Sequence, residues 1–168
     1  MDKTEFTTLV IPLKDRLFRL AKRILVSTDE AEDAVQEVLL KLWHGRENFK
    51  IYKSPEAFAI TMTKNYCLDR LKSKQASTLK IVHSDYRTSE NLERDVEASE
   101  GVALVFKIME NLPEQQRIML QLRDVEQFEF EEIAEMLGKS ETAIRVTLSR
   151  ARKSVRDSLI KKYEYGIK

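Results

Sequence analysis

The sequence is poor in the residues that build disulfides, metal sites and tight turns. Its 168 residues include one cysteine (Cys67), two histidines, four glycines and three prolines. A single cysteine excludes a disulfide within the chain and a thiolate zinc site, and His44 and His83 lack the spacing of metal ligands. There is also no phosphate-binding glycine loop and no nucleophile paired with a base. We therefore expect no metal, no cofactor and no catalytic residue.

Long apolar runs are missing as well. No segment approaches the roughly 20 apolar residues that a helix needs to span a bilayer. The N-terminal stretch MDKTEFTTLVIPLKDR has no secretory signal pattern. These absences predict a cytoplasmic protein that does not insert directly into a membrane.

Charge of one sign is not in excess overall, but its distribution is uneven. The net charge of +1 does not by itself indicate a nucleic-acid partner. Residues 49–80 carry seven Lys/Arg and two Asp/Glu, a net +5, and residues 138–168 carry nine and three, a net +6. An acidic block precedes each of them. Two basic blocks of this kind create local fields that attract a polyanion.

Helical periodicity is what the sequence has in abundance. Apolar residues recur at three and four positions in almost every segment, and there is no convincing alternating strand. Residues 77–100 break this period and are polar and acidic, which favours a flexible linker. We predict an all-α protein with two small helical domains, residues 1–76 and 101–168, joined by that linker.

The stretch EEIAEMLGKSETAIRVTLSRARKSVR, residues 131–156, is typical of a helix-turn-helix. Gly138 suits the left-handed turn at a helix end, and Ser140 is a good N-cap for the next helix. Breaks at Pro113 and near Gln127 separate further helices that precede the pair. One apolar stripe of the second helix should face inward: Ile144, Leu148, Ala151 and Val155.

The opposite face of this second helix predicts a DNA-reading surface. Val146 is apolar on an otherwise polar face, and a thymine methyl is one group that it could contact. Residues near the helix start would reach base edges, whereas later cations would reach phosphates. The alternative is a basic, solvated helix of a bundle. The predicted DNA contacts are Thr142, Arg145, Val146, Ser149, Arg150, Arg152 and Lys153.

A helix predicted over residues 29–43 has an exposed face with the character of a protein-binding surface. Ser27 or Thr28 can cap it. Leu40 stands among acidic and polar residues, and an apolar anchor rimmed by charge is typical of an interface; the alternative is an ordinary acidic surface. The core stripe is Ala31, Val35, Val38 and Leu42. The exposed face holds Asp33, Gln36, Glu37 and Leu40.

Aromatic and cationic residues are interleaved in the segment that follows, WHGRENFKIYKSPEAFAITMTKNYCLDRLKSK. Single-stranded nucleic acids are bound by stacking aromatics and a cationic track. The helical part has an apolar stripe that includes Phe58, Met62 and Tyr66. We expect Trp43, Phe58 and Tyr66 to be core residues, and the loop 45–53 to hold an extruded base.

Together these motifs resemble the extracytoplasmic-function (ECF) group of sigma-70 factors, the small two-domain sigma factors of bacteria. DEAEDAVQEVLLKLW resembles the helix that docks on the clamp helices of the large RNA polymerase subunit. SPEAFAITMTKNYCLDRLK resembles the helix that melts the promoter and reads the −10 element. LPEQQRIMLQLRDVEQFEFEEIAEMLGKSETAIRVTLSRARKSVR resembles the −35-reading domain. The match covers roughly residues 6–74 and 102–158.

The resemblance implies promoter-specific transcription initiation through binding to core RNA polymerase and to promoter DNA. It implies that the face around Leu40 binds core polymerase and that the second helix of the helix-turn-helix reads the duplex −35 element. An anti-sigma factor, often one anchored in the inner membrane, would hold the protein inactive. The residues implied at the single-stranded −10 element are Asn48, Phe49, Lys50, Lys64, Asn65 and Arg70.

The sequence departs from the family pattern at a few positions. Phe58 replaces a usual tryptophan in the melting helix, and Gln127 replaces a usual glycine before the helix-turn-helix. Val146 and Thr147 replace a more usual polar-basic pair, so promoter preference should not be copied from a relative. The alternatives are a helix-turn-helix regulator that acts on duplex DNA without polymerase, an enzyme, and a helical protein that binds only a regulator.

Overall fold

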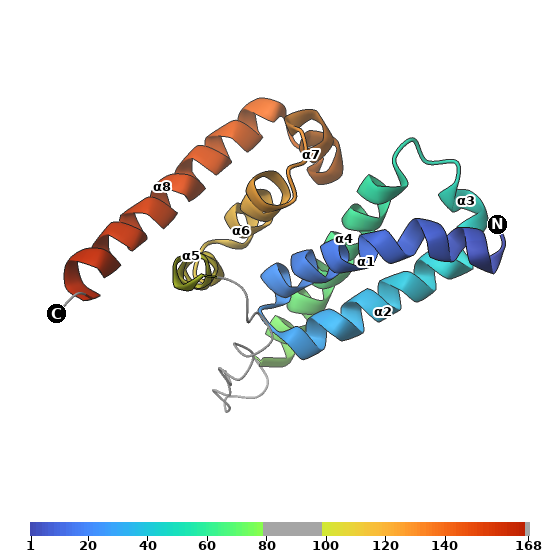
Figure 1. Ribbon diagram of the computed structural model, residues 1–168, viewed down its shortest axis with the longest axis horizontal. Helices are drawn as coiled ribbons and strands as arrows, with labels where there is room; N and C mark the ends of the chain where they lie inside the picture. The colour runs from blue at the N-terminus through green and yellow to red at the C-terminus, as the bar shows by residue number, and fades with distance from the viewer. Residues whose placement is uncertain (79–98, 167–168) are drawn as a thin grey trace. The chain divides into compact units, whose positions relative to one another are not determined.

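A computed structural model describes residues 1–78 and 99–166. The chain divides into two compact units, Met1–Asn91 and Leu92–Lys168 (Figure 1). All regular structure within the described ranges is helical, which confirms the predicted all-α class. Most of the predicted linker 77–100 lies outside the described residues, so its flexibility and the domain limits stay predictions.

The first unit consists of α1 (Lys3–Leu25), α2 (Thr28–His44), the short α3 (Arg46–Phe49) and α4 (Pro55–Thr78). Side-chain caps mark the starts of α2 and α4. The Ser27 hydroxyl accepts a hydrogen bond from the amide of the third residue of α2, and Ser54 does the same for α4. The cap that the sequence predicts for the start of α2 is therefore confirmed.

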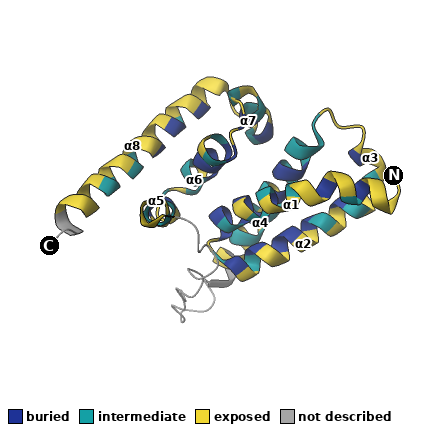
Figure 2. Cartoon of the chain, in the orientation of Figure 1, coloured by how far each residue is buried: buried dark blue, intermediate teal, exposed yellow. Residues whose placement is uncertain are grey.

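α1, α2 and α4 pack against one another in pairs and enclose the core of the first unit. Their buried faces turn toward each other, whereas the outer face of α2 is exposed (Figure 2). The core stripe predicted for α2 is confirmed in full: Ala31, Val35, Val38 and Leu42 are buried.

The apolar stripe predicted for α4 is wrong in its rotational register. Phe58, Met62 and Tyr66 are only half-buried, and the residues that face the core are Ala59, Ile60, Thr63 and Cys67. Small side chains face inward where helices approach closely, and the aromatic rings lie at the margin of the packed face. Thr63 is tolerated there because its hydroxyl donates a hydrogen bond to the Ala59 carbonyl at 2.8 Å.

The second unit contains α5 (Glu100–Glu110), α6 (Glu114–Leu120), the π-helical turn η1 (Gln121–Val125), α7 (Phe130–Leu137) and α8 (Glu141–Gly166). α8 packs against α5, α6 and α7. The predicted breaks at 112–113, near 127 and at 138 are confirmed. So is most of the inward stripe of α8, because Ile144, Leu148 and Ala151 are buried.

Two left-handed residues shape the connections on either side of α7. Gly138 ends α7 with φ +62°, as predicted for that glycine. Gln127 has φ +60°, in the left-handed region that glycine adopts without steric cost. A side chain at such a φ costs about 1–2 kcal/mol, because its Cβ crowds the following carbonyl.

Replacing Gln127 by glycine should therefore stabilise the second unit. The strain that is removed exceeds the extra backbone entropy of glycine in the unfolded chain, so the free energy of unfolding should rise by about 0.5–1 kcal/mol. Urea denaturation followed by circular dichroism would measure it. Tryptophan fluorescence would not detect this change, because the single tryptophan, Trp43, lies in the first unit.

Gly138→Ala is the matched opposite, because open space surrounds Gly138 and backbone strain is the main cost of the added methyl. It should lower the free energy of unfolding by about 1 kcal/mol. Equal effects of the same sign from the two variants would contradict the strain at Gln127.

Candidate polymerase and promoter-DNA interfaces

The outer face of α2 presents the predicted protein-binding residues together. Asp33, Gln36 and Glu37 are exposed, and Leu40 is 53% exposed although it is a large apolar residue. The core contacts of α2 come from the opposite stripe of the helix, so Leu40 does not contribute to them. This face is an apolar anchor within an acidic rim, available to a partner.

The segment predicted as a base-holding loop contains the single-turn helix α3, and the assignment of Phe49 to DNA contact is wrong for this structure. Phe49 is 1% exposed. Its ring centroid lies 6.3 Å from those of Phe6 and Phe58, so the ring belongs to the aromatic core of the first unit. Trp43 and Phe58, which the sequence predicts as core residues, pack against this cluster but are only half-buried.

Tyr52 is the aromatic residue that this segment exposes. Its ring stacks on Phe58 with centroids 3.8 Å apart and an interplanar angle of 13°. Ile51 beside it is 78% exposed. Tyr52 lies within the predicted loop 45–53 but is not among the residues implied there at the −10 element, because an aromatic residue in a loop has no periodicity to reveal which ring packs inward. The exposed aromatic residue of this segment is thus Tyr52 rather than Phe49.

The flanking polar residues predicted for single-stranded DNA are accessible in different degrees. Asn48, Lys50 and Asn65 are exposed, whereas Lys64 and Arg70 are half-buried. Lys50 forms an ion pair with Glu5 at 3.1 Å. The hydrogen bond that the Lys50 ammonium donates within this pair lowers the pKa of the Glu5 carboxyl below its ordinary value.

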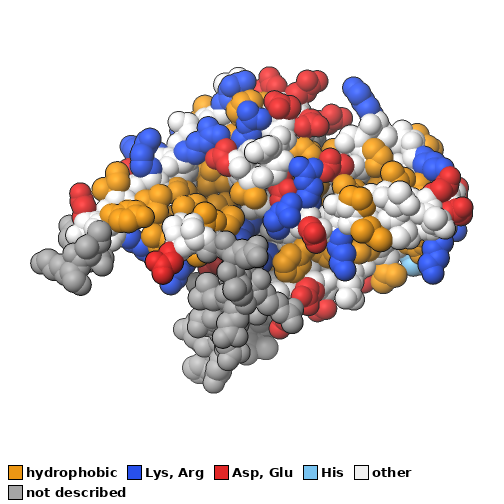
Figure 3. Space-filling view, viewed as in Figure 1, with side chains coloured by type: hydrophobic (Ala, Val, Ile, Leu, Met, Phe, Trp, Pro, Cys, Tyr) orange, Lys and Arg blue, Asp and Glu red, His pale blue; other side chains and the backbone are white. Residues whose placement is uncertain are grey.

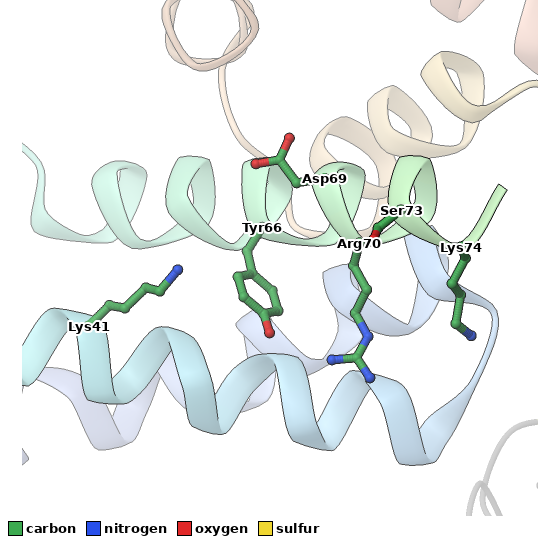
Figure 4. A pocket seen from close by; sticks show the side chains of 6 residues that line it. All are labelled: Lys41, Tyr66, Asp69, Arg70, Ser73 and Lys74. Atoms are coloured by element: carbon green, nitrogen blue, oxygen red, sulfur yellow. The ribbon is translucent and has the colours of Figure 1, made fainter. Parts of the chain in front are cut away.

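Arg70 lines an open groove of about 500 Å³ between α2 and α4. In Figure 4, Tyr66 and Arg70 point from α4 toward α2, and Asp69 points away. The Lys41 ammonium lies 4.8 Å from the centroid of the Tyr66 ring, and Lys74 pairs with Glu30. Cations therefore dominate this groove, which lies beside the track predicted for a single strand.

α7 and α8 form the predicted helix-turn-helix, and Ser140 caps α8 through a 3.1 Å hydrogen bond from the Ala143 amide. Figure 3 shows Lys and Arg side chains along α8. Val146 is 44% exposed, so its apolar side chain is not a core residue. All the residues predicted for DNA contact are exposed: Thr142, Arg145, Val146, Ser149, Arg150, Arg152 and Lys153.

Arg152 differs from its neighbours because it is already paired. Its guanidinium donates to both carboxylate oxygens of Asp124, at 2.6 and 3.0 Å. This bidentate contact raises the pKa of Arg152 and ties α8 to η1. Arg152 thus has a structural partner in the free protein, whereas the described residues offer none to Arg150 or Lys153.

Other kinds of site find little support in the described part of the chain. It contains no group of three or more His, Cys, Asp or Glu that could hold a metal ion. Burial raises the pKa of the Cys67 thiol to about 12, so the reactive thiolate is scarce at neutral pH. Across residues 1–78 and 99–166, no helix combines the length and apolarity that a membrane crossing requires.

Comparison with known proteins identifies both units. Residues 9–77 match the family Sigma-70 region 2, and residues 104–155 match the family Sigma-70, region 4. The RNA polymerase sigma-H factor of Pseudomonas aeruginosa is 25% identical, over 94% of this chain and 88% of that protein. The ECF RNA polymerase sigma-E factor of Escherichia coli K12 is 24% identical, over 92% and 86%.

Solved structures show the same fold. The sigma factor RpoE from Bartonella quintana, solved in complex with the anti-sigma factor NepR, matches with a TM-score of 0.74 and 21% identity, over 92% of this chain and 96% of that one. CnrH, solved with the cytosolic domain of CnrY, matches with a TM-score of 0.67 and 20% identity, over 95% and 90%. With the two sigma regions in order along one chain, this protein belongs to the ECF group of the sigma-70 family and is an RNA polymerase sigma factor.

Proposed function

We propose that this sigma factor uses three separate surfaces during promoter-specific initiation. The outer face of α2 binds core RNA polymerase. The observation that carries this assignment is Leu40, an exposed apolar side chain whose neighbours on the same face are polar or acidic. The polymerase-binding residues are Asp33, Gln36, Glu37 and Leu40.

The first unit would also hold the unwound −10 strand. Tyr52 offers an exposed aromatic side chain beside Phe58, and cations follow along α4, so an aromatic residue for stacking and a cationic track occur together. Energy for melting would come from binding extruded bases and single strand rather than from nucleotide hydrolysis, which makes the proposed role non-catalytic. The residues proposed here are Asn48, Lys50, Tyr52, Lys64, Asn65 and Arg70.

The second unit would place α8 in the major groove of the −35 element. Base edges are assigned to residues 142–149 of α8 and phosphates to the cations that follow. Arg152 would join the phosphate contacts only by exchanging its Asp124 partner for DNA. The proposed base-contacting residues are Thr142, Arg145, Val146 and Ser149, and the phosphate-contacting residues are Arg150, Arg152 and Lys153.

In vitro transcription from a promoter library tests the proposal as a whole. Core polymerase together with this protein should yield transcripts that share upstream −10 and −35 motifs. Core polymerase alone should yield none of these transcripts. Selective binding to duplex DNA in the absence of core-dependent transcripts would contradict the proposed surfaces.

The salt dependence of promoter binding separates base contacts from phosphate contacts. Arg150→Ala and Lys153→Ala should each weaken binding of the holoenzyme equally at all −35 variants. Each should also flatten the slope of log K against log salt by about 1, because one fewer counterion is released. Filter binding between low and moderate salt would measure this slope.

Arg145→Ala is the contrasting variant. It should alter the preference among −35 variants at one position by about 1–3 kcal/mol, because a bidentate contact to a base edge distinguishes that base pair from the others. A uniform loss at every −35 variant would show that Arg145 contacts a phosphate instead.

We also propose that an anti-sigma factor regulates this chain and that it acts in the cytoplasm, where polymerase and promoters are found. Two proteins of the same fold support this proposal: RpoE was solved with the anti-sigma factor NepR, and CnrH was solved with the cytosolic domain of CnrY. A purified anti-sigma candidate from the same genome should abolish core-dependent transcription when added before core polymerase. Unchanged transcription would dismiss that candidate.

A further inference from the structure

Phe130, the first residue of α7, contacts two arginines from different helical segments. The guanidinium carbon of Arg145 in α8 lies 4.0 Å from the centroid of the Phe130 ring, and that of Arg123 in η1 lies 4.4 Å away. Both distances are well within the range of cation–π attraction, which extends to about 6 Å. Phe130 is half-buried, so water screens these contacts only in part.

Arg123 is fixed in place by backbone and side-chain partners. Its guanidinium donates a 2.8 Å hydrogen bond to the Phe128 carbonyl and lies 3.4 Å from a carboxylate oxygen of Glu129. Both partners lie in the turn that leads into α7. Arg123 therefore links the Phe130 ring to η1, and Glu129 offsets part of the charge that Arg123 brings near Arg145.

Arg145 is in a different situation, because its hydrogen-bond donors remain unused. Among the residues that the structure describes, none forms a hydrogen bond or an ion pair with its guanidinium. A cation over an aromatic face is held by the ring quadrupole without consuming an N–H donor. All five donors of the guanidinium thus stay available for a base edge or a phosphate.

We propose that Phe130 is a positioning residue for −35 recognition, which holds the Arg145 guanidinium in place for reading a base. This inference rests on the proposed function of Arg145. An arginine that is ordered before binding loses less side-chain entropy when it binds, and its fork is presented in one orientation, which favours bidentate contact with one base pair. Phe130 itself need not touch DNA.

The test compares Phe130→Leu with Phe130→Tyr in the holoenzyme, on promoters that differ at single −35 positions. Leucine retains apolar volume without a ring quadrupole, whereas tyrosine retains the ring. Phe130→Leu should reduce discrimination roughly three- to tenfold at the position that Arg145→Ala relaxes, and at no other. Phe130→Tyr should retain it. In the Arg145→Ala background, Phe130→Leu should have no further effect on discrimination.

A purely structural role for Phe130 predicts other results. An equal loss at every −35 variant, or additive effects of Phe130→Leu and Arg145→Ala on discrimination, would overturn the inference. If Arg145→Ala relaxes a position that Phe130→Leu leaves intact, the inference fails while the base-reading role of Arg145 survives. If Arg145→Ala relaxes no position, the base-reading role itself fails, and the inference fails with it.

A spectroscopic readout checks the contact without DNA. Protons of the Arg145 side chain near the face of the Phe130 ring should be shifted upfield in the NMR spectrum of the full chain. Phe130→Leu should move these resonances toward their random-coil positions, and Phe130→Tyr should leave them shifted. Unshifted Arg145 protons in the unmodified, folded protein would overturn the inference.

Discussion

Replacing Leu40 by arginine should abolish core-dependent transcription while the protein stays folded. The exposed side chain leaves room for arginine, so the free energy of unfolding should change by less than about 0.5 kcal/mol. Binding to core polymerase should fall by roughly 100-fold or more, because an apolar anchor is lost and an unpaired charge would have to be buried. Titration of labelled sigma factor with core polymerase measures the loss directly.

Ile11→Arg is the matched control for this variant. Ile11 is also a large apolar residue on the surface of the first unit, 64% exposed, but it belongs to α1. Ile11→Arg should leave the affinity for core polymerase within about twofold of that of the unmodified protein, because an exposed residue outside the interface contributes little to affinity. Equal losses from the two variants would show that core binding does not depend on the face around Leu40.

How far the sequence predicts this molecule depends on how regular each element is. The buried and exposed faces of α2 follow from periodicity because one narrow stripe is apolar and the remainder is polar. α4 offers two adjacent apolar stripes, one aromatic and one with small residues. Sequence spacing alone cannot decide which stripe packs inward, and Ala59 and Cys67 face the core where Phe58 and Tyr66 were expected.

The candidate sites show the same limit. Exposure of Arg145 and Val146 was predictable from their place on a helix. The Arg123–Phe130–Arg145 cluster was not, because its members come from η1, α7 and α8 and meet only after the chain folds. The Asp124–Arg152 pair could not be predicted from the sequence for the same reason. The backbone strain at Gln127 follows from its positive φ, which the residue type alone does not predict.

Phe49→Ala should destabilise the first unit strongly, because its ring lies in the centre of an aromatic cluster. Truncation of a buried phenylalanine costs about 3–5 kcal/mol through lost burial and the cavity that remains. That is a large fraction of the stability of a small domain. Trp43 fluorescence should report a lower urea midpoint, since its neighbour Phe6, 5.1 Å away between centroids, also packs on Phe49.

Tyr52→Ala separates packing from DNA contact. Tyr52 is exposed and contributes one stacked pair, so its loss should cost only about 0.5–1.5 kcal/mol of stability. Promoter opening should nevertheless fall, because removing a stacking ring weakens single-strand binding by about 1–3 kcal/mol per base. Permanganate footprinting of the −10 region measures opening at a temperature where both variants are folded. Under those conditions Phe49→Ala should open promoters normally. Impaired opening by a folded Phe49→Ala protein would show that Phe49 does contribute to DNA binding.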